Sequence, residues 1–183
     1  AYVHIPFCHR RCFYCDFAII PLGNKVETLQ GYGSKTVKEY LHFLYKEILS
    51  IKHKSPLSTI YIGGGTPSIL NPKQIKDLID LFKENYGVDY GAEITMEVDP
   101  ASFNQDDLFG FINAGINRFS LGVQSFNNQI LQKSGRRHLK EDAEKSCLWL
   151  KREYDSGLIK SWSLDLIQNL PLSGFKEWQD DLK

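Results

Sequence analysis

Three cysteines close to the beginning of the chain, Cys8, Cys12 and Cys15, form a CxxxCxxC run directly after a short apolar segment. Three thiolates can bind three irons of a [4Fe–4S] cluster, which ordinarily takes four cysteines. The remaining iron would be open to another ligand. An open position on a metal centre is typical of chemistry or ligand binding rather than of a purely structural site. The run therefore predicts a cluster that can bind a small molecule.

Two other interpretations of these cysteines stay open at this point. A zinc ion normally takes four ligands, and His4 or His9 could supply the fourth. A disulfide framework suits small secreted chains that are dense in cysteine, whereas this chain has four cysteines in 183 residues and no recognisable signal peptide. We therefore expect a reduced, cytoplasmic protein. The fourth cysteine, Cys147, falls on the apolar face of an expected helix and is interpreted as a packed core thiol.

The composition argues against a nucleic-acid partner and against a membrane span. The 22 Lys and Arg residues balance the 22 Asp and Glu residues, so no basic field would attract nucleic acid. No apolar run approaches the roughly 20 residues that a membrane span needs. The length suits one domain. We expect residues 1–183 to be the core domain of a longer protein whose C-terminal domain is absent from this sequence.

Strand and helix patterns alternate along the chain, which predicts an α/β fold with about five βα units, a parallel sheet and right-handed crossovers. Thr36 and Glu39 have the spacing of a capping box, and Asn71 precedes a proline at the first helical position. The expected strands cover residues 2–7, 59–62, 93–98, 117–123 and 161–167, with a loop over residues 19–34. The expected helices begin near Thr36, after Asn71, after Asn104, near Lys140 and after Ser173.

The position of the polar motifs favours a curved, partial (β/α) barrel over a doubly wound sheet. Each expected strand is followed at its carboxyl end by a chemically distinctive segment. In a barrel these ends converge on one face, where the active site lies. In a doubly wound sheet they would meet only at a switch point. The segments are residues 8–15, 63–67 and 97–100, Gln124 with Ser125, and Asp165 with Asn169.

A glycine run, GGGTP at residues 63–67, follows the second expected strand directly. Glycines allow a ligand to approach the backbone, and we expect the run to offer N–H groups as donors. A phosphate loop and a tight turn are the alternatives, but the Lys-Ser/Thr pair of a Walker A motif is missing.

Four further polar residues lie near strand ends and could contact a ligand. Glu97 can accept bonds from ribose hydroxyls, although it could equally be a solvated acid or part of a helix cap. Gln124 offers both a donor and an acceptor. Arg136 can grip a carboxylate, although an Arg pair is by default a solvated face. Asp165 would be functional if alternation turns it inward, because buried acids are rare unless paired.

The ordered motifs YxHIPFCxxxCxxC, GGGTP, EVDP, GVQSF, GRRH and DLIxxLP extend from Tyr2 to Pro171, and the similarity that they carry continues to about Leu182. Together they resemble the oxygen-independent coproporphyrinogen III oxidase family of radical S-adenosylmethionine (radical SAM) proteins. The resemblance implies that the three cysteines ligate a [4Fe–4S] cluster whose open iron binds the amino and carboxylate groups of S-adenosylmethionine. It also implies roles for nine other residues: Tyr2, Gly64, Gly65, Thr66 and Glu97 contact S-adenosylmethionine, Tyr14 packs against the cluster, and Gln124, Arg136 and Asp165 line this cofactor or a second small-molecule site.

The pair Asp16-Phe17 departs from the oxidases of this family, which have another cysteine two places after the third. The pair resembles instead the HemW-like branch, whose members bind haem and pass it to acceptor proteins such as respiratory enzymes, some of them membrane-associated. We therefore expect a haem chaperone with little or no oxidase activity, and assign no catalytic residue. The alternatives are a radical SAM oxidase acting on the propionates of a porphyrinogen, and a degenerate fold used as a scaffold.

Overall fold

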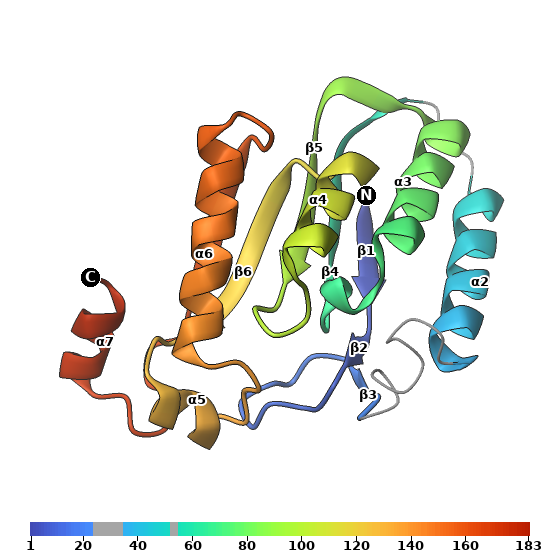
Figure 1. Ribbon diagram of the computed structural model, residues 1–183. Helices are drawn as coiled ribbons and strands as arrows, with labels where there is room; N and C mark the ends of the chain where they lie inside the picture. The colour runs from blue at the N-terminus through green and yellow to red at the C-terminus, as the bar shows by residue number, and fades with distance from the viewer. Residues whose placement is uncertain (24–34, 52–54) are drawn as a thin grey trace.

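A computed structural model describes residues 1–23, 35–51 and 55–183. Within these residues, five parallel strands form one sheet in the order β1-β4-β5-β6-β7 (Figure 1). Each strand pairs with the next strand of the sheet along the chain, and the order never reverses. This winding is that of a (β/α) barrel and lacks the switch point of a doubly wound sheet, so the expected fold is confirmed. The strands are β1 (Tyr2–Ile5), β4 (Leu57–Gly64), β5 (Val88–Val98), β6 (Arg118–Gln124) and β7 (Ser161–Leu166).

The longer helices lie on one side of this sheet (Figure 1). A constant direction of winding with right-handed crossovers requires this arrangement, because each crossover then passes over the same face. The longer helices are α2 (Lys35–Ser50), α3 (Pro72–Tyr86), α4 (Gln105–Ala114) and α6 (Lys140–Asp155). Three shorter ones are η1 (Pro67–Ile69), α5 (Asn128–Lys133) and α7 (Phe175–Asp181).

The hydrophobic core fills the space between sheet and helices. Ile62, Met96 and Phe119 contribute fully buried side chains from three neighbouring strands. Leu78 of α3 and Phe111 of α4 are fully buried in the same cluster. This packing makes the sheet a rigid base, so the positions of the strand ends are well determined.

Of the four expected helix caps two are confirmed and two are wrong, and α6 begins at Lys140 as expected. Asn71 and Asn104 each accept a backbone N–H bond from the residue three places on, in complete capping boxes. Thr36 lies inside α2, which begins at Lys35, so it cannot cap that helix. Gly174, not Ser173, occupies the position before α7. Spacing alone does not distinguish a cap from the first turn of a helix that has already begun.

The expected strand at residues 2–7 is broken at Pro6, which lacks an N–H group for the ladder. The chain continues as β2 (Phe7–Cys8), which pairs in parallel with β3 (Ile20–Pro21). Cys8 therefore ends β2, and Cys12 and Cys15 lie on a loop that is closed at its base, where Ile20 N–H donates to the Pro6 carbonyl at 2.6 Å. We call residues 9–19 the cysteine loop. Of the expected loop over residues 19–34, residues 24–34 lie outside the described part of the chain.

None of the described helices is sufficiently long and apolar to cross a membrane.

Candidate functional site

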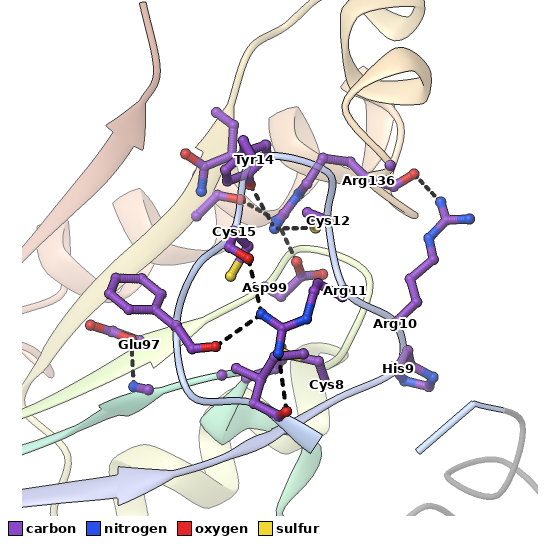
Figure 2. A pocket seen from close by; sticks show the side chains of 18 of the residues that line it. Cys8, His9, Arg10, Arg11, Cys12, Tyr14, Cys15, Glu97, Asp99 and Arg136 are labelled. Atoms are coloured by element: carbon purple, nitrogen blue, oxygen red, sulfur yellow. Dashed lines mark hydrogen bonds and ion pairs between the residues drawn. The ribbon is translucent and has the colours of Figure 1, made fainter. Parts of the chain in front are cut away.

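A cavity of about 750 Å³ lies at the carboxyl ends of the strands, between them and the cysteine loop (Figure 2). This is the face on which the sequence placed the polar motifs. The cavity brings together eleven of the twelve predicted site residues: Cys8, Cys12, Tyr14, Cys15, Gly64, Gly65, Thr66, Glu97, Gln124, Arg136 and Asp165.

Tyr2 is the predicted residue that does not line this cavity. It is the first residue of β1, so it lies at the opposite end of that strand from the site. Its ring is stacked on Tyr61, with 6.1 Å between ring centroids, and its hydroxyl is 3.0 Å from His4 Nδ1. Tyr2 therefore packs against the tyrosine that donates to Glu97, and its contact with S-adenosylmethionine stays a prediction.

The three cysteines are free thiols around one cavity, and two of the sulfurs have a polar neighbour. Thr66 Oγ1 donates to Cys8 Sγ at 3.4 Å, and Arg136 Nη1 lies 3.9 Å from Cys12 Sγ. Cys15 N–H donates to the Cys12 carbonyl at 3.1 Å, which makes a turn between these two cysteines. Burial raises the pKa of the Cys8 thiol, while the bond from Thr66 opposes this effect.

The chemistry of this donor set, three free thiols, fits a [4Fe–4S] cluster. Over the described residues, no three His, Cys, Asp or Glu side chains are placed to hold one metal ion. A cluster does not need such convergence, because each thiolate binds a different iron. His4 is also occupied: Nε2 lies 2.8 Å from the Ala18 carbonyl, and Nδ1 faces the Tyr2 hydroxyl. Both ring nitrogens of His4 are thus engaged away from a zinc site.

The glycine run touches both the cysteine loop and the strand ends. A methyl group on Gly65 would lie 2.9 Å from Cys8 Sγ and 2.7 Å from the Phe7 carbonyl oxygen, so only glycine fits against this cysteine. Gly64 has φ +120°, which also favours glycine. The run thus allows Phe7 and Cys8 to approach its backbone closely, whereas the approach of a ligand stays a prediction.

The expectation that this run offers its N–H groups to a ligand is wrong for three of them. Gly64 N–H donates to Glu97 Oε2 at 3.0 Å. Gly65 N–H and Thr66 N–H donate to the carbonyls of Ile5 and Phe7 at 2.8 and 2.7 Å. Because these donors are already used, the segment can offer a ligand carbonyl oxygens, which suit an ammonium group.

Glu97, at the end of β5, is held by two neighbours inside the cavity wall. Besides the bond from Gly64, its Oε1 accepts a bond from the Tyr61 hydroxyl at 2.7 Å. Burial and the nearby Glu97 carboxylate together raise the pKa of Tyr61, so this phenol remains a donor. Glu97 is therefore a fixed carboxylate rather than a solvated acid. The sequence analysis missed Tyr61, whose place two residues before the glycine run puts it on the same face of β4 as Gly63.

Arg136 joins the cysteine loop to two strands and is not the solvated residue that an Arg pair suggests. Its side chain is 11% exposed and forms an ion pair with Asp99, which is 21% exposed. Nη2 also donates to the Gly122 carbonyl at 2.6 Å, and Nη1 lies 3.5 Å from the Tyr14 hydroxyl. Its Nε atom is buried without a partner among the described residues. Asp99 stands in the EVDP motif, but its pairing with Arg136 has no signal in the sequence.

Gln124 and Asp165 complete the far wall of the cavity. Gln124 ends β6 with φ +70°, a conformation that non-glycine residues rarely adopt and that often marks functional sites. Asp165 lines the cavity and accepts a bond from Ser120 Oγ at 3.0 Å. Asp165 thus lies at the site, but it is exposed there rather than buried, so its role toward a ligand stays a prediction.

The fold and this site define the class of protein. The family model described as the Radical SAM superfamily matches residues 2–162. Since this match covers most of the chain, the protein belongs to the radical SAM superfamily. The superfamily implies a [4Fe–4S] cluster and S-adenosylmethionine as cofactors, and the cysteine set described above fits such a cluster.

Relatives similar to most of the chain include heme chaperones and coproporphyrinogen III oxidases. The chain is 41% identical to heme chaperone HemW of Synechocystis over its whole length, and 34% identical to heme chaperone HemW of Escherichia coli. It is 38% identical to the oxygen-independent coproporphyrinogen III oxidase of Salmonella typhimurium over 93% of the chain. The solved coproporphyrinogen III oxidase HemN from Escherichia coli superposes with a TM-score of 0.83 and 32% identity over 99% of the chain.

The chain spans less than half the length of these relatives. It covers 42% of the Synechocystis protein, 46% of the Escherichia coli chaperone and 35% of the Salmonella oxidase. It covers 39% of the solved HemN chain.

Proposed function

We propose that residues 1–183 form the radical SAM core of a longer cytoplasmic haem chaperone. In this proposal the full-length protein binds haem and transfers it to acceptor proteins, some of them associated with membranes. The similarity to two HemW chaperones over the whole chain supports this assignment. The core would act as a redox or cofactor-gated module for haem transfer.

The residues around the cavity would divide the work of holding the cofactors. Cys8, Cys12 and Cys15 would ligate the cluster, which supplies one electron and one open iron when it is bound. Carbonyls of the glycine run would accept bonds from the amino group of S-adenosylmethionine. The fixed carboxylate of Glu97 would accept bonds from its ribose hydroxyls.

On the far side of the cavity, Arg136, Gln124 and Asp165 would line this cofactor or a second small molecule. The Arg136 guanidinium already pairs with Asp99, so the charge it presents to a ligand carboxylate is partly balanced. Tyr14, on the cysteine loop, has its hydroxyl 3.5 Å from Arg136 Nη1 and would pack against the cluster. Burial is the largest of the effects on Tyr14 and raises its pKa, so its hydroxyl stays protonated beside the thiols.

The observation that carries the choice of chaperone over oxidase is Phe17. It lines the cavity and is 68% exposed, at the place where the oxidases that this chain resembles have a cysteine. A cysteine beside a metal centre can act as a redox or hydrogen-transfer partner. A phenylalanine can only pack, either shielding the cluster or stacking on a flat ligand.

The test is a comparison of two activities in the full-length protein under anaerobic, reducing conditions with S-adenosylmethionine. We expect no conversion of coproporphyrinogen, and stoichiometric haem binding that is visible as a Soret band after gel filtration. Phe17→Cys should not restore oxidase activity, because a substrate pocket is also required. Robust formation of protoporphyrinogen by the unmodified protein would replace this proposal with the oxidase, which the similarity to the Salmonella enzyme and to HemN supports.

A further inference from the structure

Arg11, between the first two cysteines, reaches across the inside of the cysteine loop (Figure 2). Its Nη1 donates to the Cys15 carbonyl at 2.9 Å and to the Phe17 carbonyl at 3.0 Å. Its Nη2 donates to the Ile19 carbonyl at 3.3 Å. One guanidinium therefore connects three alternate residues of a segment that belongs to no helix or strand until β3 begins.

These bonds determine the shape of the loop. The three carbonyls converge on one point, where their negative ends would repel one another without a cation between them. The planar, multiply donating guanidinium matches this arrangement, and charge-assisted bonds of this kind are about twice as strong as neutral ones. A lysine carries the same charge but has no planar fork with which to hold three acceptors in fixed directions.

We propose that Arg11 is a positioning residue that holds the cysteine loop in its cluster-binding shape and keeps a positive charge beside the cluster. The inference rests on the proposed ligation of the cluster by Cys8, Cys12 and Cys15. Arg11 acts through the backbone of Cys15, whose carbonyl it binds, and so sets the direction in which this thiolate approaches the iron. It binds the Phe17 carbonyl in the same way, and so couples the cluster ligand to the exposed ring at the mouth of the cavity.

The charge has a separate consequence. A cation near the cluster stabilises its reduced form, which carries one more negative charge, and so raises the reduction potential. Arg11 is exposed, so salt screens part of this effect. The positioning effect depends on the fork, whereas the effect on the potential depends only on the charge, so different substitutions separate the two.

The experiment compares Arg11→Gln, Arg11→Lys and Arg10→Gln in the full-length protein after anaerobic reconstitution. Arg10 is the matched control, because it is a neighbouring arginine that donates to the Arg136 carbonyl and not to a carbonyl of the cysteine loop. Iron retention is measured against a chelator, and the midpoint potential of the cluster by titration. We expect Arg11→Gln to lower iron affinity by about 10- to 100-fold, the usual range for residues that orient metal ligands, and to lower the potential.

The other two variants have different expected results. Arg11→Lys should retain iron less well than the wild type but better than Arg11→Gln, at a potential close to that of the wild type. Arg10→Gln should retain iron like the wild type. Wild-type retention in both Arg11 variants would overturn the proposal, as would equal losses in Arg10→Gln and Arg11→Gln. If Arg11→Gln does not fold, Arg11→Lys alone decides between these outcomes.

A measurement on the metal-free protein separates this proposal from the cluster assignment. Hydrogen exchange of the amides of residues 12–19 should be faster in Arg11→Gln than in the wild type, and unchanged in Arg10→Gln. If the wild type takes up no iron but this difference is found, the cluster assignment fails and the loop-positioning role of Arg11 stands. If exchange is the same in all three proteins, Arg11 does not position the loop.

Discussion

At the scale of the residue, Gly65 lies directly against Cys8, a predicted cluster ligand. The methyl group of an alanine there would meet the Phe7 carbonyl oxygen and Cys8 Sγ at 2.7 and 2.9 Å, both closer than a real Cβ contact. Because the obstacle includes backbone, β2 would have to move. Gly65→Ala should therefore cost about 1–3 kcal/mol in the free energy of unfolding, and should lower both iron retention and S-adenosylmethionine affinity.

The control for this substitution is Gly91→Ala. A methyl group on Gly91 has nothing within 4 Å, so urea unfolding and calorimetric binding should match the wild type. Unchanged iron retention in Gly65→Ala would contradict the placement of this glycine against a ligand.

His138 gives a prediction for pH. Its ring is buried, Nε2 faces the Val123 carbonyl at 3.0 Å and Nδ1 faces Arg136 at 3.2 Å. Because a carbonyl can only accept, Nε2 carries the proton and Nδ1 accepts from the guanidinium. Burial is the largest effect and lowers the pKa of His138. Attraction to Asp99 opposes it, and repulsion from Arg136 adds to it, so the pKa stays below its ordinary value of 6.5. The bond to the Val123 carbonyl and then Asp142 also act to raise this pKa.

The sign of the effect follows from linkage. As pH falls below 6.5, the unfolded chain binds a proton at this residue and the folded chain does not, so stability is lost. Above that pH the contribution is constant. Free energies of unfolding from about pH 7.5 to about 5.5 should therefore fall more steeply for the wild type than for His138→Gln. Parallel curves for the two proteins would show that His138 has the same pKa in the folded and the unfolded chain.

At the scale of the element, two predicted helix caps with the same sequence spacing have opposite outcomes: Asn71 caps its helix, and Thr36 does not. Asn71 accepts the Gln74 N–H at 2.8 Å, so Asn71→Ala should lower the free energy of unfolding by about 1 kcal/mol. Thr36 lies exposed within α2, so Thr36→Ala should leave stability unchanged or slightly higher, since alanine is the better helix former. Urea unfolding of the two variants measures the difference, and equal losses would contradict the assigned start of α2.

The sequence predicted the elements because their signals are local. The apolar stripe of α3, its Asn-Pro start and the glycine after α4 all lie within a few residues of the structure they determine. The short α5, which begins after Asn127, was missed because its six residues contain too little periodicity. The strand β5 is longer than expected because its first residues are exposed and lack an apolar pattern.

The site was predicted less completely, since much of it depends on contacts between distant segments. The cysteines and the glycine run were found because their spacing is itself the signal. The pairing of Arg136 with Asp99 joins residues 37 positions apart, and the bond from Tyr61 to Glu97 spans 36. Neither pair has a periodicity that a single sequence could reveal. The three bonds of Arg11 are local, yet no sequence rule assigns a guanidinium to the inside of a loop.

At the scale of the whole molecule, the winding of the sheet explains why one cavity gathers so many of these residues. Because the strand order β1-β4-β5-β6-β7 never reverses, every carboxyl end opens on the same face (Figure 1). The cysteine loop, closed by β2 and β3, covers that face. Residues from the first fifteen positions thus meet Arg136 and Asp165 in one space.

The measurement that tests this account most directly is anaerobic reconstitution of the full-length protein, followed by iron and sulfide analysis and spectroscopy. We expect about four irons per chain and a spectrum that changes when S-adenosylmethionine is added, because three thiolates leave one iron open. Alanine at Cys8, Cys12 or Cys15 should abolish the cluster, whereas Cys147→Ala should retain it, since Cys147 packs against the core on α6. Stoichiometric zinc in the purified protein, with no uptake of iron, would contradict the account.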